Sequence, residues 1–194
     1  MIDEIFERNI GYDEKSKLCI DKILVSEKEI AEIITDMAKK IESDYKNKKV
    51  LIVGVLKGAY VFMSDLTRRL RLDAELHFVS ASSYGPRSKS SGNVELNDFK
   101  PDEDFSGYDV IIIDDILDSG NTMKKLREYF NGRNAKSVEF CVFLDKTAAR
   151  ADCVSAKYIG KAIDDAFVVG YGLDYREKFR NLPYVAVLKK EVYM

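Results

Sequence analysis

Asp109–Asp115 constrains the fold more than any other segment of the chain. Its sequence, DVIIIDD, holds a β-branched apolar run that ends in two aspartates. Such a run is typical of a strand buried on both faces of a sheet. Val50–Val55 (VLIVGV) has the same character. Strands covered on both faces belong to parallel sheets flanked by helices, so we predict an α/β fold.

Helical patterns separate these strands and support this prediction. Ser26 and Glu29 match a capping box at the start of the first helix. Apolar residues recur at helical spacing in three segments: Ile30, Ile33, Ile34, Met37 and Ile41; Val61, Phe62, Leu66 and Leu70; Met123, Leu126, Tyr129 and Phe130. Further strands are predicted at 74–81, 137–144, 166–170 and 184–188, with a short one at 94–96.

Composition limits the classes of function. The chain has 194 residues, the size of one ordinary domain, with 31 Lys and Arg against 33 Asp and Glu. This balance lacks the basic surface that bulk nucleic-acid binding needs. No apolar run reaches the roughly 20 residues of a membrane helix, and the acidic start is unlike a secretion signal. The three separated cysteines are expected to be reduced thiols in a cytoplasm: Cys19, Cys141 and Cys153.

Polar residues follow both buried strands. Asp114 and Asp115 close one strand, and the small polar run 118–122 (DSGNT) then opens a helix. Ligands of parallel α/β sheets bind at the carboxyl ends of strands. A metal, a sugar diol or a cation would compensate the two carboxylates, and the loop and helix N-terminus favour a phosphate. Lys57 and Gly58, after the other strand, can meet an anion, although a plain turn explains them equally well.

This loop also has two simpler interpretations. Asp118, Ser119 or Thr122 could merely cap the helix, but a cap does not require the preceding acidic pair. A nucleotide triphosphatase loop is disfavoured because the chain has no GxxxxGKS/T motif.

The segment IIIDDILDSGNT (111–122) resembles the ribose-phosphate signature of the type I phosphoribosyltransferases. FVVGYGLDYREKFRNLPYVAVL (167–188) resembles the C-terminal signature of the hypoxanthine/guanine branch. LKGA (56–59) resembles its pyrophosphate loop, and SSYG (82–85) the start of its mobile loop. These segments, with the lysine that ends FLDK (143–146), occur in the family's order.

The resemblance implies the type I phosphoribosyltransferase fold in a single domain, 1–194. This is a parallel sheet flanked by helices (core about 26–146), a small hood lobe from the N-terminus and about 147–194, and a mobile lid at about 82–104. The implied reaction, in purine salvage, moves 5-phosphoribose from phosphoribosyl pyrophosphate to hypoxanthine or guanine and yields IMP or GMP and pyrophosphate. Mg²⁺ is the implied cofactor, and the family forms homodimers or homotetramers.

The resemblance also assigns roles to matching residues. Asp118 is the expected general base at purine N7. Asp114 and Asp115 are expected at the ribose hydroxyls and, with Asp174, at the metal. The 5′-phosphate would be held by Asp118, Ser119, Gly120, Asn121 and Thr122. The purine would meet Lys146 at its 6-oxygen, Phe167 by stacking, and Val168 and Asp174 at its edge. Pyrophosphate would contact Lys57, Gly58 and Arg180, and Ser83 and Tyr84 would form the lid.

Departures and alternatives qualify these roles. Asp114 stands where the branch often has glutamate, and Ala59 where it often has glycine; Ala59 would be strained only at a positive φ. Taken alone, Phe167 could be core, Lys146 a solvated strand end, and Asp174 with Arg180 a surface ion pair.

Two other functions compete with the enzyme. A regulatory protein could keep this fold to sense phosphoribosyl pyrophosphate and bind nucleic acid. Such proteins often carry an extra DNA-binding domain or a basic face, and this chain has room for neither an extra domain nor a strong excess of basic residues. A receiver-like signalling domain would explain Asp114 and Asp115, but not the segment 167–188.

Overall fold

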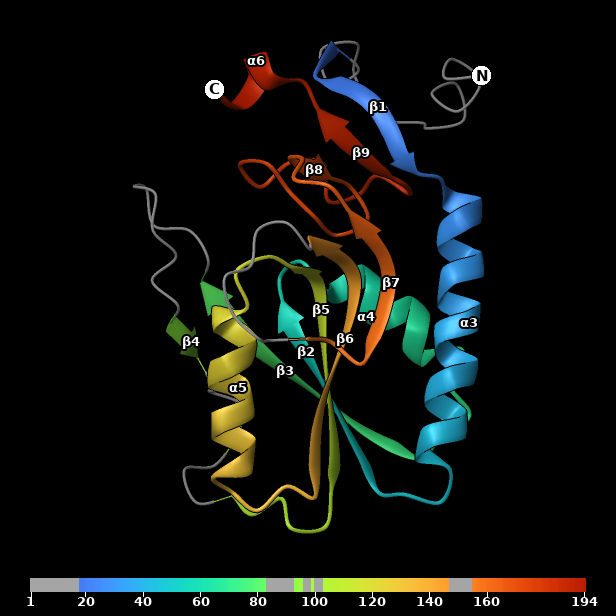
Figure 1. Cartoon of the computed structure of the whole chain (residues 1–194), viewed down its shortest axis with the longest axis vertical. Coiled ribbons are helices and arrows are strands. Elements are labelled where there is room, and N and C mark those ends of the chain that lie inside the picture. Colours follow the sequence, from blue (N-terminus) through green and yellow to red (C-terminus); the bar gives the residue numbers. More distant parts are fainter. Residues whose placement is uncertain (1–17, 83–92, 96–98, 100–102, 147–154) are drawn as a thin grey trace. The chain divides into compact units, whose positions relative to one another are not determined.

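The computed structural model describes residues 18–82, 93–95, 99, 103–146 and 155–194 (Figure 1). The chain divides into two compact units, one of Met1–Ala31 with Ala166–Met194 and one of Glu32–Asp165. Ser83 and Tyr84, expected in the lid, lie outside the described residues, as does Cys153. In the described part of the chain, Cys19 and Cys141 form no disulfide bond.

A six-stranded sheet forms the centre of the larger unit, in the order β4-β3-β2-β5-β6-β7. Its strands are β2 (Val50–Leu56), β3 (Ala74–Ser82), β4 (Asn93–Glu95), β5 (Asp109–Leu117), β6 (Ser137–Lys146) and β7 (Tyr158–Ile163). All neighbours pair in parallel except β3 and β4, which are antiparallel. The predicted parallel α/β architecture is therefore confirmed.

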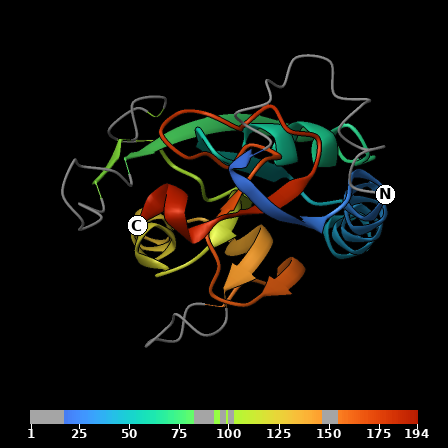
Figure 2. The ribbon, with the colours of Figure 1, turned by 90° about the horizontal axis from the view of Figure 1, so that it is seen from above.

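Helices cover both faces of this sheet (Figures 1 and 2). On one face, α5 (Asn121–Asn131) buries Met123, Leu126 and Phe130 in a cluster that includes Val53 of β2 and Ile112 of β5. On the other face, Phe62 of α4 (Tyr60–Thr67) lies 5.5 Å from Phe143, ring centre to ring centre. The expected helix at 61–70 therefore ends early, and Leu70 lies beyond it.

The helix α3 (Glu27–Tyr45) begins with the predicted capping box. The Ser26 amide donates to Glu29 Oε2 at 2.8 Å, and the Glu29 amide donates to Ser26 Oγ at 3.3 Å. The reciprocal bonds satisfy amide groups that the first helical turn leaves without partners. Ile30, Ile34 and Ile41 are buried as expected.

The smaller unit is an antiparallel sheet in the order β1-β9-β8, followed by α6 (Lys190–Tyr193). Its strands are β1 (Ile20–Val25), β8 (Val168–Val169) and β9 (Val185–Leu188). Leu182 and Tyr184 are buried in its core beside Val169. Three elements of the structure were not predicted from the sequence: β1, β7 and α6. No helix in the described part of the chain is long and apolar enough to cross a membrane.

Candidate functional site

Two adjacent carboxylates lie near the end of β5. Asp114 Oδ1 accepts the Asp115 amide at 3.0 Å, and Asp115 Oδ1 accepts the Ile116 amide at 2.7 Å. Burial, together with the neighbouring Asp115 carboxylate, raises the pKa of Asp114 well above its usual value. Ionisation of both carboxyl groups at this edge of the sheet is therefore unfavourable, and a bound cation would offset that cost.

The loop after these carboxylates opens α5 without a side-chain cap. The N-cap is Gly120, which is buried and has φ 78° and ψ 0°, a left-handed conformation that glycine adopts at little cost. Asp118 and Ser119 are exposed beside it. Because the N-cap has no side chain, the simpler interpretation of Asp118, Ser119 or Thr122 as the N-cap residue is wrong. Amides of a first helical turn have no partner within the helix and favour an anion.

Gly58 brings a second loop onto the same carboxylates. A β-carbon at this position would overlap Asp115 Oδ2 and lie 2.5 Å from Asp115 Cγ. The loop passes this closely because glycine has no side chain. Lys57 is exposed next to it, after a cis Leu56–Lys57 peptide bond. The structure thus brings together two of the segments that the sequence singled out.

Ala59 causes no strain in this loop. Its φ is −72° and its ψ is −6°, in the right-handed region that any residue adopts, and it forms the N-cap of α4. The alanine that replaces the family's usual glycine is therefore neutral for the backbone.

Lys146 closes β6 at the same edge of the sheet. Its side chain is only 14% exposed, and its Nζ lies 3.3 Å from Asp165 Oδ1. Asp165 follows β7, the neighbouring strand, and its side chain is 75% exposed. Lys146 is therefore not the solvated strand end that its position in the sequence also allowed.

Phe167, in the smaller unit, sits in an aromatic cluster. Its ring stacks on Tyr193 of α6, with centres 4.8 Å apart and planes 25° apart, and it meets Tyr175 edge to face at 5.5 Å. The Tyr175 hydroxyl donates to the Val192 carbonyl at 2.8 Å. Phe167 itself is only partly buried, whereas Val168 beside it is buried in β8. The cluster leaves part of the Phe167 ring accessible.

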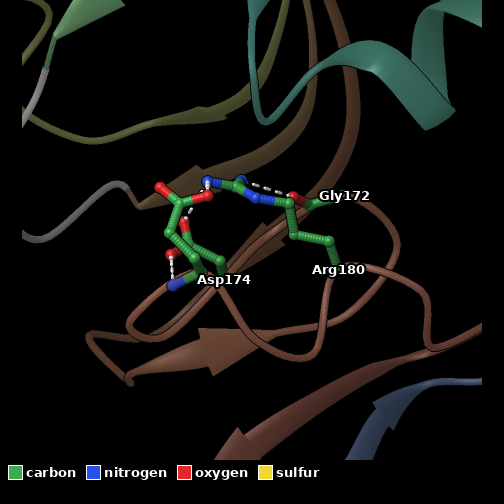
Figure 3. Close-up of polar contacts among 4 residues, drawn as sticks. Gly172, Asp174 and Arg180 are labelled. Carbon is green, nitrogen blue, oxygen red and sulfur yellow. Dashed lines mark hydrogen bonds and ion pairs between the residues drawn. The ribbon is translucent and has the colours of Figure 1, made fainter.

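Asp174 and Arg180 form an ion pair within one loop (Figure 3). Arg180 Nη2 lies 2.8 Å from Asp174 Oδ1, and Nη1 donates to the Gly172 carbonyl at 2.8 Å. Both side chains are 18% exposed, so the pair is largely buried rather than on the surface. The loop is tightly turned, with positive φ at Gly172 (101°) and at Phe179 (75°).

The carboxylates suit a hard divalent cation held partly by substrate. Among the described residues, no group of three or more His, Cys, Asp or Glu side chains could hold a metal alone. Mg²⁺ typically binds through one or two carboxylates, with waters and substrate phosphates completing its shell. Asp114 and Asp115 provide that number of side chains and the oxygen ligands that Mg²⁺ prefers.

Comparison with known proteins identifies the family. The model of the phosphoribosyl transferase domain matches residues 22–176. The chain belongs to the phosphoribosyltransferase family. The hypoxanthine-guanine phosphoribosyltransferase of Bacillus subtilis (strain 168) is 44% identical over 175 residues, which cover 90% of this chain and 96% of the relative. The chain thus falls in the hypoxanthine-guanine branch, as its C-terminal segment suggested.

Two further matches agree with this branch. A crystal structure of a hypoxanthine phosphoribosyltransferase from Staphylococcus aureus has a TM-score of 0.86 and 38% identity, covering 96% of this chain and 100% of that one. The bifunctional protein TilS/HprT of Listeria innocua is 43% identical over 97% of this chain. The chain spans 29% of the length of that relative. The type I phosphoribosyltransferase fold expected from the sequence is confirmed.

Sequence reasoning missed the partners of two predicted site residues. Asp165 pairs with Lys146, and Tyr193 stacks on Phe167. No sequence motif identifies Asp165 or Tyr193 as part of a site. An acidic residue near a strand end and an aromatic residue near a terminus are ordinary features. Only the pairing of β6 with β7 and the turn into α6 give them these neighbours.

Proposed function

We propose that this phosphoribosyltransferase transfers 5-phosphoribose from phosphoribosyl pyrophosphate to hypoxanthine, guanine or both, as in purine salvage. The observation that carries the proposal is the strand-end pair Asp114–Asp115, followed by the glycine-capped loop 118–122, in a chain 44% identical to a hypoxanthine-guanine phosphoribosyltransferase. The products are IMP or GMP and pyrophosphate.

The loop 118–122 is the proposed site of the 5′-phosphate. The amides that begin α5 point out of the helix, and the hydroxyls of Ser119 and Thr122 add donors. Asp114 and Asp115 accept hydrogen bonds from the ribose hydroxyls, since ionised carboxylates are acceptors only. Lys57 and the amide of Gly58 take the pyrophosphate, because Gly58 lets the backbone approach closely.

Asp118 is the proposed general base. It is exposed and lies two residues before Gly120, the N-cap of α5. As pyrophosphate leaves, positive charge develops on the ribose and on the attacking base. A carboxylate at purine N7 stabilises that charge and accepts the N7 proton.

Base recognition is assigned to Lys146, Phe167, Val168 and Asp174. The Lys146 ammonium is a donor only, so it favours a 6-oxo purine over a 6-amino one. Phe167 offers a flat face for stacking, and Val168 offers its main chain to the base edge. Asp174 assists at the base edge and at the metal, and Arg180 assists at the pyrophosphate through its planar guanidinium.

Mg²⁺ is the proposed cofactor. Asp114 and Asp115 would hold it at the ribose hydroxyls, and Asp174 would help to hold it at the pyrophosphate, in each case together with substrate oxygens. When bound, it neutralises the negative charge of phosphoribosyl pyrophosphate and of the leaving pyrophosphate.

We also infer a cytoplasmic setting and self-association into a homodimer or homotetramer. Cys19 and Cys141 form no disulfide bond among the described residues, which suits a reducing compartment. The large apolar side chains of Tyr60, Leu76 and Phe78 are 39–49% exposed, and a second copy would cover such surface. Sedimentation at several protein concentrations measures the assembly directly.

The test of the proposed function is pyrophosphate release with Mg²⁺ and phosphoribosyl pyrophosphate. Hypoxanthine, guanine, xanthine and adenine are supplied separately. We expect turnover with 6-oxopurines and little with adenine. Asp118→Asn should lower kcat by about 10²–10⁴-fold, the usual contribution of a general base.

Asp36→Asn is the matched control, because Asp36 is an exposed helix residue paired with Lys39 at 3.1 Å. It should leave kcat unchanged. Tight binding of phosphoribosyl pyrophosphate without turnover on any base would contradict the enzyme and favour the sensing protein.

A further inference from the structure

Lys146 has one ion-pair partner among the described residues, and that partner has no assigned role. Lys146 Nζ lies 3.3 Å from Asp165 Oδ1. The lysine side chain is 14% exposed, so its stem is packed and its ammonium meets the carboxylate at the protein surface. The contact joins a buried donor to an accessible acceptor.

The parallel pairing of β6 with β7 brings Lys146 and Asp165 together. β6 and β7 run parallel, and Lys146 is paired with Ile163 at the last position of their register. Asp165 stands two residues beyond that pair, at the carboxyl end of β7. Parallel strands end at the same sheet edge, which is where α/β proteins bind their ligands.

An ammonium on a four-carbon stem needs a partner to point in one direction. It carries three equivalent donors and rotates freely, unlike the planar guanidinium of arginine. A carboxylate that accepts one N–H fixes the direction of the other two. Asp165 therefore limits the positions from which Lys146 can donate to a ligand.

We infer that Asp165 is a positioning residue for purine recognition, which orients the Lys146 ammonium toward the 6-oxygen of the base. The inference rests on the proposed function, because it assigns Asp165 to the base site of that same reaction. Asp165 does not touch the reacting atoms and acts through Lys146.

The adjacent aspartate provides a matched control. Asp164 is also exposed and also acidic, but no ion pair joins it to another described residue. Asp164→Asn and Asp165→Asn each remove one negative charge from neighbouring positions. A difference between them therefore reports the contact with Lys146 and not the local charge.

The experiment is steady-state kinetics of the full chain with hypoxanthine and phosphoribosyl pyrophosphate, for both variants and for Asp165→Glu. Ion pairs with an exposed partner contribute up to about 1 kcal/mol, so Asp165→Asn should raise KM for hypoxanthine by about two- to fivefold. KM for phosphoribosyl pyrophosphate and kcat should stay near the wild type. Asp165→Glu, which keeps the carboxylate, should recover part of the loss, and Asp164→Asn should show none.

A double-mutant cycle separates positioning from a general structural role. In a Lys146→Met background, Asp165→Asn should have no further effect on KM for hypoxanthine, because the residue it orients is gone. Equal effects of Asp165→Asn with and without Lys146, or equal effects of the two Asn variants, would overturn the inference. Absence of turnover in the wild type would instead contradict the proposed function, so the two failures are distinct.

Discussion

Gly58 lies against the carboxylate of Asp115 so closely that a β-carbon at position 58 would overlap Oδ2. The loop after β2 is therefore in close contact with the acidic end of β5. The contact joins the proposed pyrophosphate site to the proposed ribose site, since each contributes one of the two residues.

Gly58→Ala is expected to disturb both sites at once. The methyl group must displace either the Asp115 carboxylate or the loop, and overpacking of this kind costs about 1–3 kcal/mol. Because each 1.36 kcal/mol is tenfold in rate, kcat/KM for phosphoribosyl pyrophosphate should fall about tenfold or more. Steady-state kinetics and thermal unfolding measure the two effects.

Gly107→Ala is the control for this substitution. Among the described residues, a β-carbon at Gly107 would meet only Lys49 Cδ, at the ordinary contact distance of 3.8 Å. Its kinetics should equal those of the wild type. If Gly58→Ala kept full activity, the close approach of Gly58 to Asp115 would have no bearing on catalysis.

Arg180→Lys should lower the stability of the loop 170–180. The guanidinium reaches the Gly172 carbonyl and the Asp174 carboxylate with separate nitrogens, and a lysine offers only one (Figure 3). Removing a hydrogen bond to a charged, largely buried group costs about 1.5–3 kcal/mol, so the melting temperature should fall. KM for phosphoribosyl pyrophosphate should rise as Asp174 loses its support.

The comparison for this variant is Arg176→Lys. Arg176 is exposed in the same loop, and its guanidinium lies 5.1 Å from the centre of the Tyr175 ring. It should show wild-type stability and kinetics. Equal behaviour of the two variants would mean that Arg180 acts only through its charge.

The parts of the fold that were predicted from the sequence are those with a local signal. The apolar run before Asp114 and Asp115 identifies a buried strand by its own composition, and Ser26 and Glu29 identify a helix start within four residues. The run does not show where the strand stops: β5 continues to Leu117, two residues past the predicted end.

The missed strands lack such a signal. β1 pairs with β9 from the far end of the chain, and its register shifts between Ile20 and Lys22 and again between Ile23 and Val25. These irregularities break the alternation of apolar and polar residues that a sequence pattern requires. β7 lies at the edge of its sheet and includes Lys161 and a glycine. Strands like these are determined by their partners rather than by their own residues.

The same reasoning applies to the site. The motif residues Asp114, Asp115 and Asp118 were predicted because they lie within five residues of one another, at the end of β5 and in the loop after it. Asp165 was not, because its pairing with Lys146 depends on the register of β6 and β7.

The capping box gives a stability prediction that does not involve the site. Ser26→Ala removes the hydroxyl that accepts the Glu29 amide and donates to Glu29 Oε2. Loss of an N-cap hydroxyl typically costs about 1 kcal/mol, so the free energy of unfolding in urea should fall by that amount. Ser26→Thr keeps the hydroxyl and should lose much less. Equal losses would show that the hydroxyl contributes nothing at this position.

Alkaline pH should unfold the protein through its buried tyrosines. Burial raises the pKa of Tyr45 and that of Tyr184 to about 12. Burial also raises the pKa of Tyr158, whose hydroxyl donates a hydrogen bond to Asp44 Oδ2 at 2.6 Å. In the unfolded chain these phenols ionise near their ordinary pKa of about 10. The neutral form is therefore favoured by folding. This contribution to stability is complete below pH 10 and is lost as the pH rises toward 12.

Urea unfolding at pH 8 to 11.5 should show a free energy of unfolding that declines from about pH 10, with tyrosinate absorbance appearing together with unfolding. Tyr45→Phe has no proton to lose at this position, so its decline over the same range should be shallower than that of the wild type; an identical decline would exclude Tyr45 as a source of the effect.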